Sequence, residues 1–240
     1  MTVRAVCAVQ GEDAAARDCL ARLEEVARAL TDPPEFARVA DGERATLPER
    51  LPGYDVYLSV APDMRVLRPE ALRLHLLYGR RRDRTFVAVP ESDPAYVTAA
   101  DPALARAAAA VRRARLAAAF GADIADRQLL LPRFDAGIVT GRADSPIWRA
   151  WRERAEQAPT DDAFDVAALD VEGWFRMPTT MGWLCGLRLP WRAPDGTWRH
   201  PEHRPEPIYA ARLSPPLPAM VAVTGAALVT EAYRAIGLTQ

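Results

Sequence analysis

The chain has 240 residues and a formal net charge of −1 at pH 7, because 31 Lys and Arg residues are balanced by 32 Asp and Glu residues. This length is enough to bury the core of one α/β domain, so we expect residues 1-240 to form a single domain. The balanced charge argues against nucleic acid or an anionic membrane as a partner.

The cysteines and the apolar runs give an expected location. Cys7, Cys19 and Cys185 are odd in number and widely spaced, which fits reduced thiols that behave as small apolar side chains. The first residues, MTVRAVCAVQGED, become acidic too soon for a signal peptide. The longest apolar run, residues 217–229, is too short to cross a bilayer. We therefore expect a cytoplasmic protein without a transmembrane segment, and peripheral membrane contact stays open.

Strands and helices alternate along the first part of the chain. Residues 3–9 predict a strand, which a helical pattern follows, and residues 36–40 predict a weaker strand. Residues 56–60 form a continuous apolar run that is typical of a strand buried on both faces. A helix is expected from Pro69, and His75 falls within its apolar pattern, which indicates a packed structural histidine.

The alternation continues in the second part. Residues 85–89 predict a strand, and Pro102 opens a long Ala/Arg helix whose four arginines argue against a membrane span. Ile138 and Val139 predict another strand, before a helix that starts at Ser145 and Pro146. We expect residues 190–207 to form a long surface loop. The sequence therefore predicts an α/β fold with a mostly parallel central sheet, helices on both faces, and residues 56–60 and 86–89 as interior strands.

One carboxylate follows the predicted strand at residues 56–60. The strand runs directly into Ala61, Pro62 and Asp63. Ligands of open α/β sheets bind beyond the carboxyl ends of the strands, so Asp63 is a candidate for holding a metal or a sugar. The alternative is a solvated aspartate in a turn.

Five short segments resemble, in the same order, the nucleotide-sugar glycosyltransferases of the A fold type, in particular the glycogenin-like, family-eight-like bacterial members. The segments are YDVYL at 54–58, DAG at 135–137, DVAALD at 165–170, GWLC at 182–185 and EPI at 206–208. The resemblance covers about residues 44–214. It implies a nucleotide-diphospho-sugar transferase-like domain, with a nucleotide sugar and an unknown acceptor as partners.

The resemblance also implies a metal site that this chain has partly lost. In the family, an Asp-x-Asp pair and a distal His hold a divalent cation against the donor diphosphate, whose charge grows as it leaves. The matching positions here are Ala61, Asp63 and Arg212. We therefore expect no metal ligands and no cofactor, although Mn²⁺ or Mg²⁺ bound mainly through donor phosphates stays open. Either Arg212 replaces the metal with a fixed charge, or the site has decayed and Arg212 faces solvent.

Carried over residue by residue, the resemblance gives two sets of site residues. The catalytic candidates are Asp165 and Asp135, and the donor-binding candidates are Asp63, Ala61, Arg212, Gly137 and Trp183. Asp165 is the candidate for contacting sugar hydroxyls, and its alternative role is a cap at a helix start. Val166 replaces the family's Gln and removes a polar group expected to face the donor sugar or the acceptor.

These observations leave two classes of function. The first is a glycosyltransferase that moves a sugar from a nucleotide-sugar donor to an unknown acceptor, possibly without a metal. The second is a catalytically inactive relative that serves as a sugar- or nucleotide-binding module or as a protein-interaction module. The altered positions Ala61, Val166 and Arg212 favour the second class, and the retained Asp63, Asp135 and Asp165 favour the first.

Overall fold

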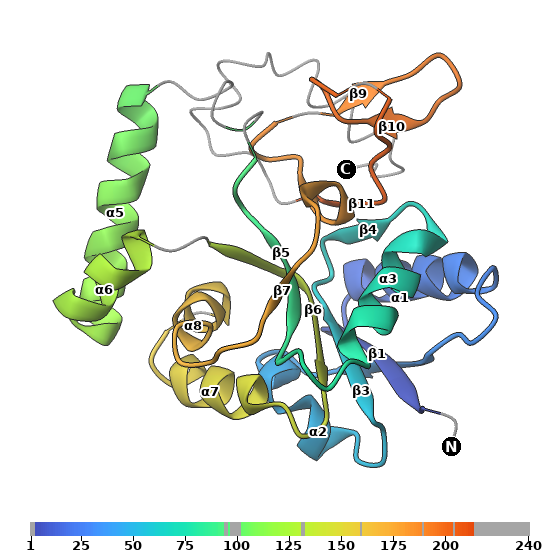
Figure 1. Cartoon of the computed structure of the whole chain (residues 1–240), viewed down its shortest axis with the longest axis horizontal. Helices are drawn as coiled ribbons and strands as arrows, with labels where there is room; N and C mark the ends of the chain where they lie inside the picture. Colours follow the sequence, from blue (N-terminus) through green and yellow to red (C-terminus); the bar gives the residue numbers. More distant parts are fainter. Residues whose placement is uncertain are drawn as a thin grey trace.

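A six-stranded sheet forms the centre of the computed structural model (Figure 1), in which residues 3–93, 96, 102–130, 133–158, 160–188, 190–203 and 205–213 are described. The strands lie in the order β2 (Glu35–Val39), β1 (Ala5–Gln10), β3 (Val56–Val60), β6 (Phe134–Arg142), β5 (Val87–Pro90) and β7 (Phe175–Arg176). The apolar run at residues 217–229 lies outside the described residues.

The sheet is mixed but mostly parallel, as the sequence predicts. β1 runs parallel to β2 and β3, and β5 runs parallel to β7. β6 is antiparallel to both of its neighbours, β3 and β5. The interior positions of β3 and β5 are confirmed, because each has a partner on both sides. The reversed direction of β6 brings its first residues to the edge where β3 and β5 end.

Helices cover both faces of the sheet, which is also confirmed. One face packs against α1 (Ala14–Ala27) and α3 (Pro69–Gly79). The other face packs against η1 (Glu43–Thr46), α2 (Leu47–Arg50), α7 (Pro146–Ala155) and α8 (Thr160–Ala167). Successive side chains of β1 alternate between the two cores, as the two-residue period of a strand requires. The continuous apolar runs of the central strands therefore reflect burial on both sides.

Smaller elements surround the carboxyl edge of the sheet. A three-stranded sheet has the order β4 (Met64–Val66), β11 (Ala210–Arg212) and β8 (Trp183–Leu184), and the short helix η2 (Thr179–Met181) precedes β8. Beside the main sheet lie α5 (Pro102–Phe120) and α6 (Ala122–Leu129), on the left of Figure 1. In the part of the chain that is described, no helix has the length and apolar character to cross a membrane.

The prediction of a loop at residues 190–207 is wrong in one respect. Two short strands, β9 (Trp191–Arg192) and β10 (Trp198–Arg199), pair as an antiparallel hairpin within this segment. The Asp195-Gly196 turn between them places Gly196 at a φ of 78°, a conformation that glycine adopts without strain. The hairpin is too short to produce a visible periodicity in the sequence.

His75 is a buried structural histidine, as its place in the helical pattern indicates. Its side chain is 0% exposed, and its Nδ1 lies 2.9 Å from the hydroxyl oxygen of Thr140 on β6. Burial lowers the pKa of His75 to about 4, because the charged imidazolium loses its hydration there. The histidine is therefore neutral in the folded protein at neutral pH.

We expect His75 to make the protein less stable as the pH falls. The unfolded imidazole, with a pKa near 6.5, binds its proton first, so protonation favours unfolding between about pH 6.5 and pH 4. This group alone should lower the free energy of unfolding by about 2 kcal/mol between pH 7 and pH 5. Urea denaturation at both pH values should show that loss in the wild type and a smaller loss in His75→Asn. The exposed His203→Asn should behave as the wild type, and equal losses in all three proteins would contradict the prediction.

Candidate functional site

The turn after β3 presents Asp63 at the carboxyl edge of the sheet. The amide of Ala61 donates a 2.8 Å hydrogen bond to the carbonyl of Gly137 on β6, and the amide of Met64 donates to the carbonyl of Ala61 at 3.1 Å. These two bonds close the turn that contains Pro62 and Asp63. The neighbouring strand therefore fixes the backbone of the turn that carries Asp63.

The antiparallel direction of β6 brings Asp135 to the same edge. Asp135 lies opposite Val89 of β5, and its Oδ1 accepts a 3.0 Å hydrogen bond from the amide of Gly137. A Cβ atom added at Gly137 would lie 2.5 Å from the sulfur of Met64 and 2.6 Å from the Oδ2 of Asp135. Glycine is therefore required at 137 by close packing.

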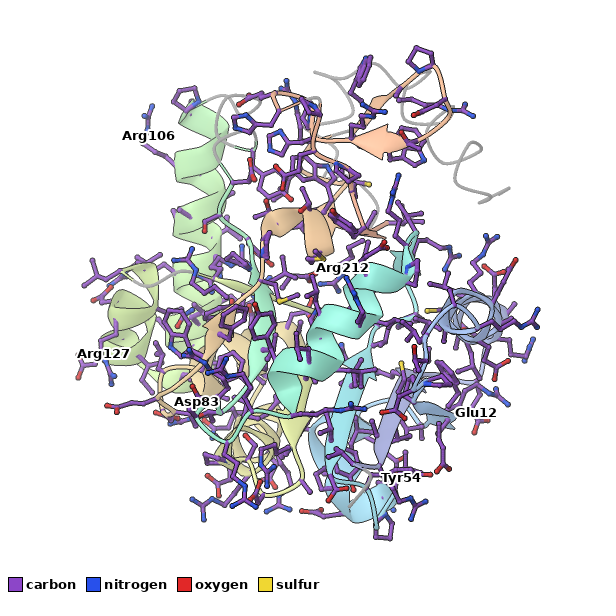
Figure 2. The ribbon with its side chains drawn as sticks, turned by 45° about the vertical axis from the view of Figure 1, so that its right-hand side comes forward. Glu12, Tyr54, Asp83, Arg106, Arg127 and Arg212 are labelled. Carbon is purple, nitrogen blue, oxygen red and sulfur yellow. The ribbon has the colours of Figure 1, made fainter. Side chains whose placement is uncertain are left out.

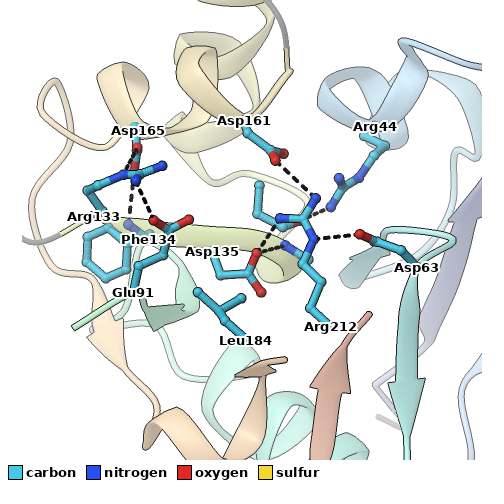
Figure 3. Close-up of polar contacts among 12 residues, drawn as sticks. Arg44, Asp63, Glu91, Arg133, Phe134, Asp135, Asp161, Asp165, Leu184 and Arg212 are labelled. Atoms are coloured by element: carbon cyan, nitrogen blue, oxygen red, sulfur yellow. Dashed lines mark hydrogen bonds and ion pairs between the residues drawn. The ribbon is translucent and has the colours of Figure 1, made fainter. Parts of the chain in front are cut away.

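Arg212 on β11 joins three carboxylates at this edge (Figure 3). Its Nε lies 2.9 Å from Asp63 Oδ2, its Nη1 lies 2.5 Å from Asp135 Oδ1, and its Nη2 lies 3.0 Å from Asp161 Oδ2. Figure 2 shows Arg212 in the middle of the molecule, whereas Arg106 and Arg127 project from its left edge. The alternative in which Arg212 simply faces solvent is therefore wrong.

The three carboxylates differ in burial, and this sets their electrostatic roles. The side chains of Asp135, Asp63 and Asp161 are 1%, 30% and 48% exposed. Burial raises the pKa of Asp135, although the nearby Arg212 guanidinium and the Gly137 amide favour the ionised form. The carboxylates in turn raise the pKa of Arg212 above its ordinary value. Arg212 thus supplies the main positive charge that opposes the cost of burying Asp135.

A cavity of about 590 Å³ lies beside this cluster. Its lining residues come from the ends of β1 and β3, from η1, and from α5, α8 and β11: Gln10, Arg44, Ala61, Pro62, Asp63, Arg115, Asp161, Asp162 and Arg212. A volume of this size is in the range of small-molecule sites. The structure therefore places Ala61, Asp63 and Arg212 of the predicted set on one cavity wall.

Arg44 is a cavity residue that the sequence analysis missed. Its side chain is buried beneath the cavity, where Nε donates a 2.7 Å hydrogen bond to the Ser59 hydroxyl and Nη2 donates to the Ala136 carbonyl. Its guanidinium carbon lies 5.3 Å from the centre of the Trp151 ring. Burial lowers the pKa of Arg44 to about 10, and among the described residues it forms no ion pair. No sequence motif surrounds Arg44, so only the fold reveals it.

Asp165 is not brought into the Arg212 cluster. It lies inside α8, so the alternative role at a helix start is wrong. Its Oδ2 lies 2.6 Å from Arg112 Nη2 and 3.4 Å from Arg133 Nε, while its Oδ1 accepts a 2.9 Å hydrogen bond from the amide of Phe134. With 1% exposure, the carboxylate is turned into the protein and links α5, α8 and β6.

Glu91 extends this second network towards the sheet edge. It directly follows β5, and its Oε2 lies 2.8 Å from Arg133 Nη1 (Figure 3). Burial raises the pKa of Glu91 to about 8, and the nearby Asp165 and Asp135 act in the same direction, while Arg133 opposes them. Burial therefore favours the protonated form of Glu91 and the ion pair with Arg133 favours the ionised form, an environment that only the structure shows.

Val166 and Trp183 belong to apolar clusters away from the cavity wall. Val166 packs with Leu116 of α5 and Ala125 of α6. Trp183 is fully buried, and its indole N–H donates a 2.6 Å hydrogen bond to the carbonyl of Arg188. Neither residue lines the cavity, and the Trp183 ring packs against other side chains of the protein.

Comparison with known proteins gives solved structures only. No protein-family model and no curated protein matches the chain. A glycosyltransferase involved in the glycosylation of the major capsid of PBCV-1 aligns with a TM-score of 0.51 at 10% identity, over 88% of this chain and 94% of its own. The fold is that of the A-type glycosyltransferases.

Two further structures of glycosyltransferases align less well. Galactosyltransferase LgtC, in complex with donor and acceptor sugar analogs, aligns with a TM-score of 0.47 at 12% identity, over 98% of this chain and 97% of its own. Mouse xyloside xylosyltransferase 1 aligns with a TM-score of 0.44 at 6% identity, over 88% of this chain and 97% of its own. At such identities the similarity concerns the fold alone.

The residues present do not fit the divalent cation that is typical of this fold family. Ala61 has no ligand atom in its side chain, and the Arg212 guanidinium lies between Asp63 and Asp135. Within the described residues, no three His, Cys, Asp or Glu side chains are grouped as a metal site. The positive charge among these carboxylates is an arginine.

We expect Arg212→Ala to lower the free energy of unfolding by about 3–5 kcal/mol, because it leaves the buried Asp135 carboxylate without its charged partner. Urea denaturation at pH 7 measures the loss. The exposed Arg106→Ala provides the control and should change stability by less than about 0.5 kcal/mol.

The double variant Arg212→Ala/Asp135→Asn identifies the cause of that loss. A neutral amide needs no cation, so the double variant should be more stable than the sum of the two single changes predicts. Strictly additive losses would contradict the assignment of Arg212 as the partner of Asp135.

Proposed function

We propose that the protein is a glycosyltransferase that moves a sugar from a nucleotide-sugar donor to an acceptor without a metal ion, and that it is a distant, family-eight-like member of its fold type. The observation that carries the proposal is the position of Arg212 between Asp63 and Asp135 at the carboxyl edge of the sheet. In open α/β sheets this edge is where ligands bind. The A-type glycosyltransferase fold supports the same reaction class.

The electrostatic requirement of the reaction supports a role for Arg212. When the sugar–phosphate bond breaks, negative charge grows on the nucleoside diphosphate, and a positive group placed in advance stabilises it. A guanidinium has five N–H donors, of which Arg212 directs three at carboxylates. Arg44 adds a second positive charge on the cavity wall, and it has no carboxylate partner among the described residues. We infer that the donor diphosphate lies between Arg44 and Arg212.

The other predicted site residues have supporting roles in this proposal. Ala61 and Asp63 form the wall beside the diphosphate, and Gly137 holds the turn that presents them. Asp135 is the proposed catalytic carboxylate, and it is linked to the cavity wall through its ion pair with Arg212. Asp165 is a positioning residue, because it holds Arg133 and the start of β6. Trp183 acts through its packing on β8, the strand that pairs with β11.

A second candidate function is a non-catalytic sugar- or nucleotide-binding module or protein-interaction module. Two observations favour it. Asp165 is enclosed by Arg112, Arg133 and the Phe134 amide, and Val166 packs into an apolar cluster. Neither residue presents a polar group to a sugar in the cavity.

For either candidate function, the buried free thiols of Cys7, Cys19 and Cys185 fit a reducing compartment, and we propose the cytoplasm.

Calorimetry with uridine diphosphate, in EDTA and in MnCl₂, tests the proposal. The affinity should be the same in both solutions, because the positive charge belongs to the chain. Arg212→Ala should weaken binding by about tenfold or more, in keeping with the loss of one charged hydrogen-bonding group. Binding that requires manganese would contradict the role of Arg212.

An activity assay separates the two candidate functions. Release of nucleoside diphosphate from a panel of nucleotide sugars should be measurable for a transferase and insensitive to EDTA. Binding of uridine diphosphate without release from any donor would favour the non-catalytic module. No binding of adenosine, guanosine or uridine diphosphate would contradict both nucleotide-dependent proposals.

A further inference from the structure

Asp161 differs from the other two carboxylates that contact Arg212. Asp63 and Asp135 belong to the central sheet, because one follows β3 and the other lies on β6. Asp161 comes from the first turn of α8 and is the most exposed of the three, at 48%. Its Oδ2 accepts the 3.0 Å hydrogen bond of Arg212 Nη2 on the cavity wall.

We propose that Asp161 is an internal anion that occupies Arg212 in the absence of donor and is displaced from it when a diphosphate binds. The proposal deepens the function proposed above and rests on it. A carboxylate oxygen and a phosphate oxygen accept hydrogen bonds from a guanidinium in the same way. Asp161 therefore takes the contact that a donor phosphate needs, and its charge also repels the donor. The contact is autoinhibitory.

Burial decides which carboxylate leaves. Asp161 is 48% exposed, so water screens its attraction to the 15% exposed Arg212 and hydrates its carboxylate once the two separate. Asp135 is 1% exposed and would be left as a buried charge without its partner, which is costly. Asp63 is held in the turn that the Ala61–Gly137 hydrogen bond closes. Of the three contacts, the one with Asp161 is the weakest.

The helix that carries Asp161 is held in place by two carboxylates that follow Asp161. Asp162, only 4% exposed, lies 2.5 Å from the Nε of Arg115, and Asp165 lies 2.6 Å from the Nη2 of Arg112. Both arginines belong to α5. Displacement of Asp161 therefore needs only rotation of its own side chain, while α8 stays in place.

Calorimetry at fixed ionic strength, with uridine diphosphate and inorganic pyrophosphate as probes, tests the displacement. Asp161→Asn removes the competing charge and should tighten binding of both probes by about three- to tenfold. Asp161→Glu keeps the charge and should bind like the wild type. Asp126→Asn, which removes a similarly exposed charge paired with Arg113 outside the cavity, should also bind like the wild type.

The outcomes separate this inference from the proposed function. Equal affinity of the wild type and Asp161→Asn for both probes would overturn the competition and leave nucleotide binding intact. Tighter pyrophosphate binding by Asp161→Asn, without uridine diphosphate binding by any variant, would support the competition and contradict the nucleotide donor. A crystal structure with uridine diphosphate should show Asp161 more than 4 Å from Arg212. An intact Asp161–Arg212 pair beside the bound nucleotide would overturn the inference.

Discussion

The ion pair between Arg212 and the buried Asp135 carboxylate is the interaction on which the carboxyl edge of this sheet depends. An ionised carboxylate with 1% exposure is tolerated only beside a positive charge or a set of hydrogen-bond donors. Arg212 supplies the charge, and the amide of Gly137 supplies a hydrogen bond. The same guanidinium also contacts the turn after β3 and the first turn of α8. One side chain therefore joins three parts of the chain that are distant in sequence.

Strand direction makes this convergence possible. β3 ends and β6 begins at the same edge, because the two strands are antiparallel. β4 begins at Met64, directly after the turn that contains Asp63. β11 pairs with β4, and this pairing places Arg212 opposite Met64. The small sheet thus places Arg212 above the end of the large one. The arginine comes from the small sheet and the Asp135 carboxylate from the large sheet, so both sheets are needed to form the ion pair.

The sequence predicts much of the fold because the central strands are buried on both faces. Their continuous apolar runs are visible without any knowledge of partners, and Ser145 with Pro146 marks the start of α7. The order of the motifs also brings Asp63, Asp135 and Arg212 forward as candidates. What decides their contacts is the reversal of β6 and the pairing of β11 with β4. The order of residue types along the chain reveals neither the direction of β6 nor the pairing partner of β11.

The side chains that sequence analysis missed or misplaced are those whose environment comes from distant segments. Arg44 stands in a short 3-10 helix without a motif, and its burial depends on β6 and α7. The raised pKa of Glu91 results from burial and from the charges of other elements. Asp165 matches a family motif, yet Arg112 on α5 turns it inward. Local sequence does not encode these surroundings.

Because the Arg212 guanidinium is covalently attached to the chain, its occupancy of the site between Asp63 and Asp135 does not depend on a binding equilibrium. An ion held only by donor atoms occupies its site according to its free concentration, so any stability that it contributes follows mass action. The guanidinium is part of the chain and has no dissociation constant. Its presence between Asp63 and Asp135 is independent of the ionic composition of the surroundings. Dialysis against a chelator cannot remove it.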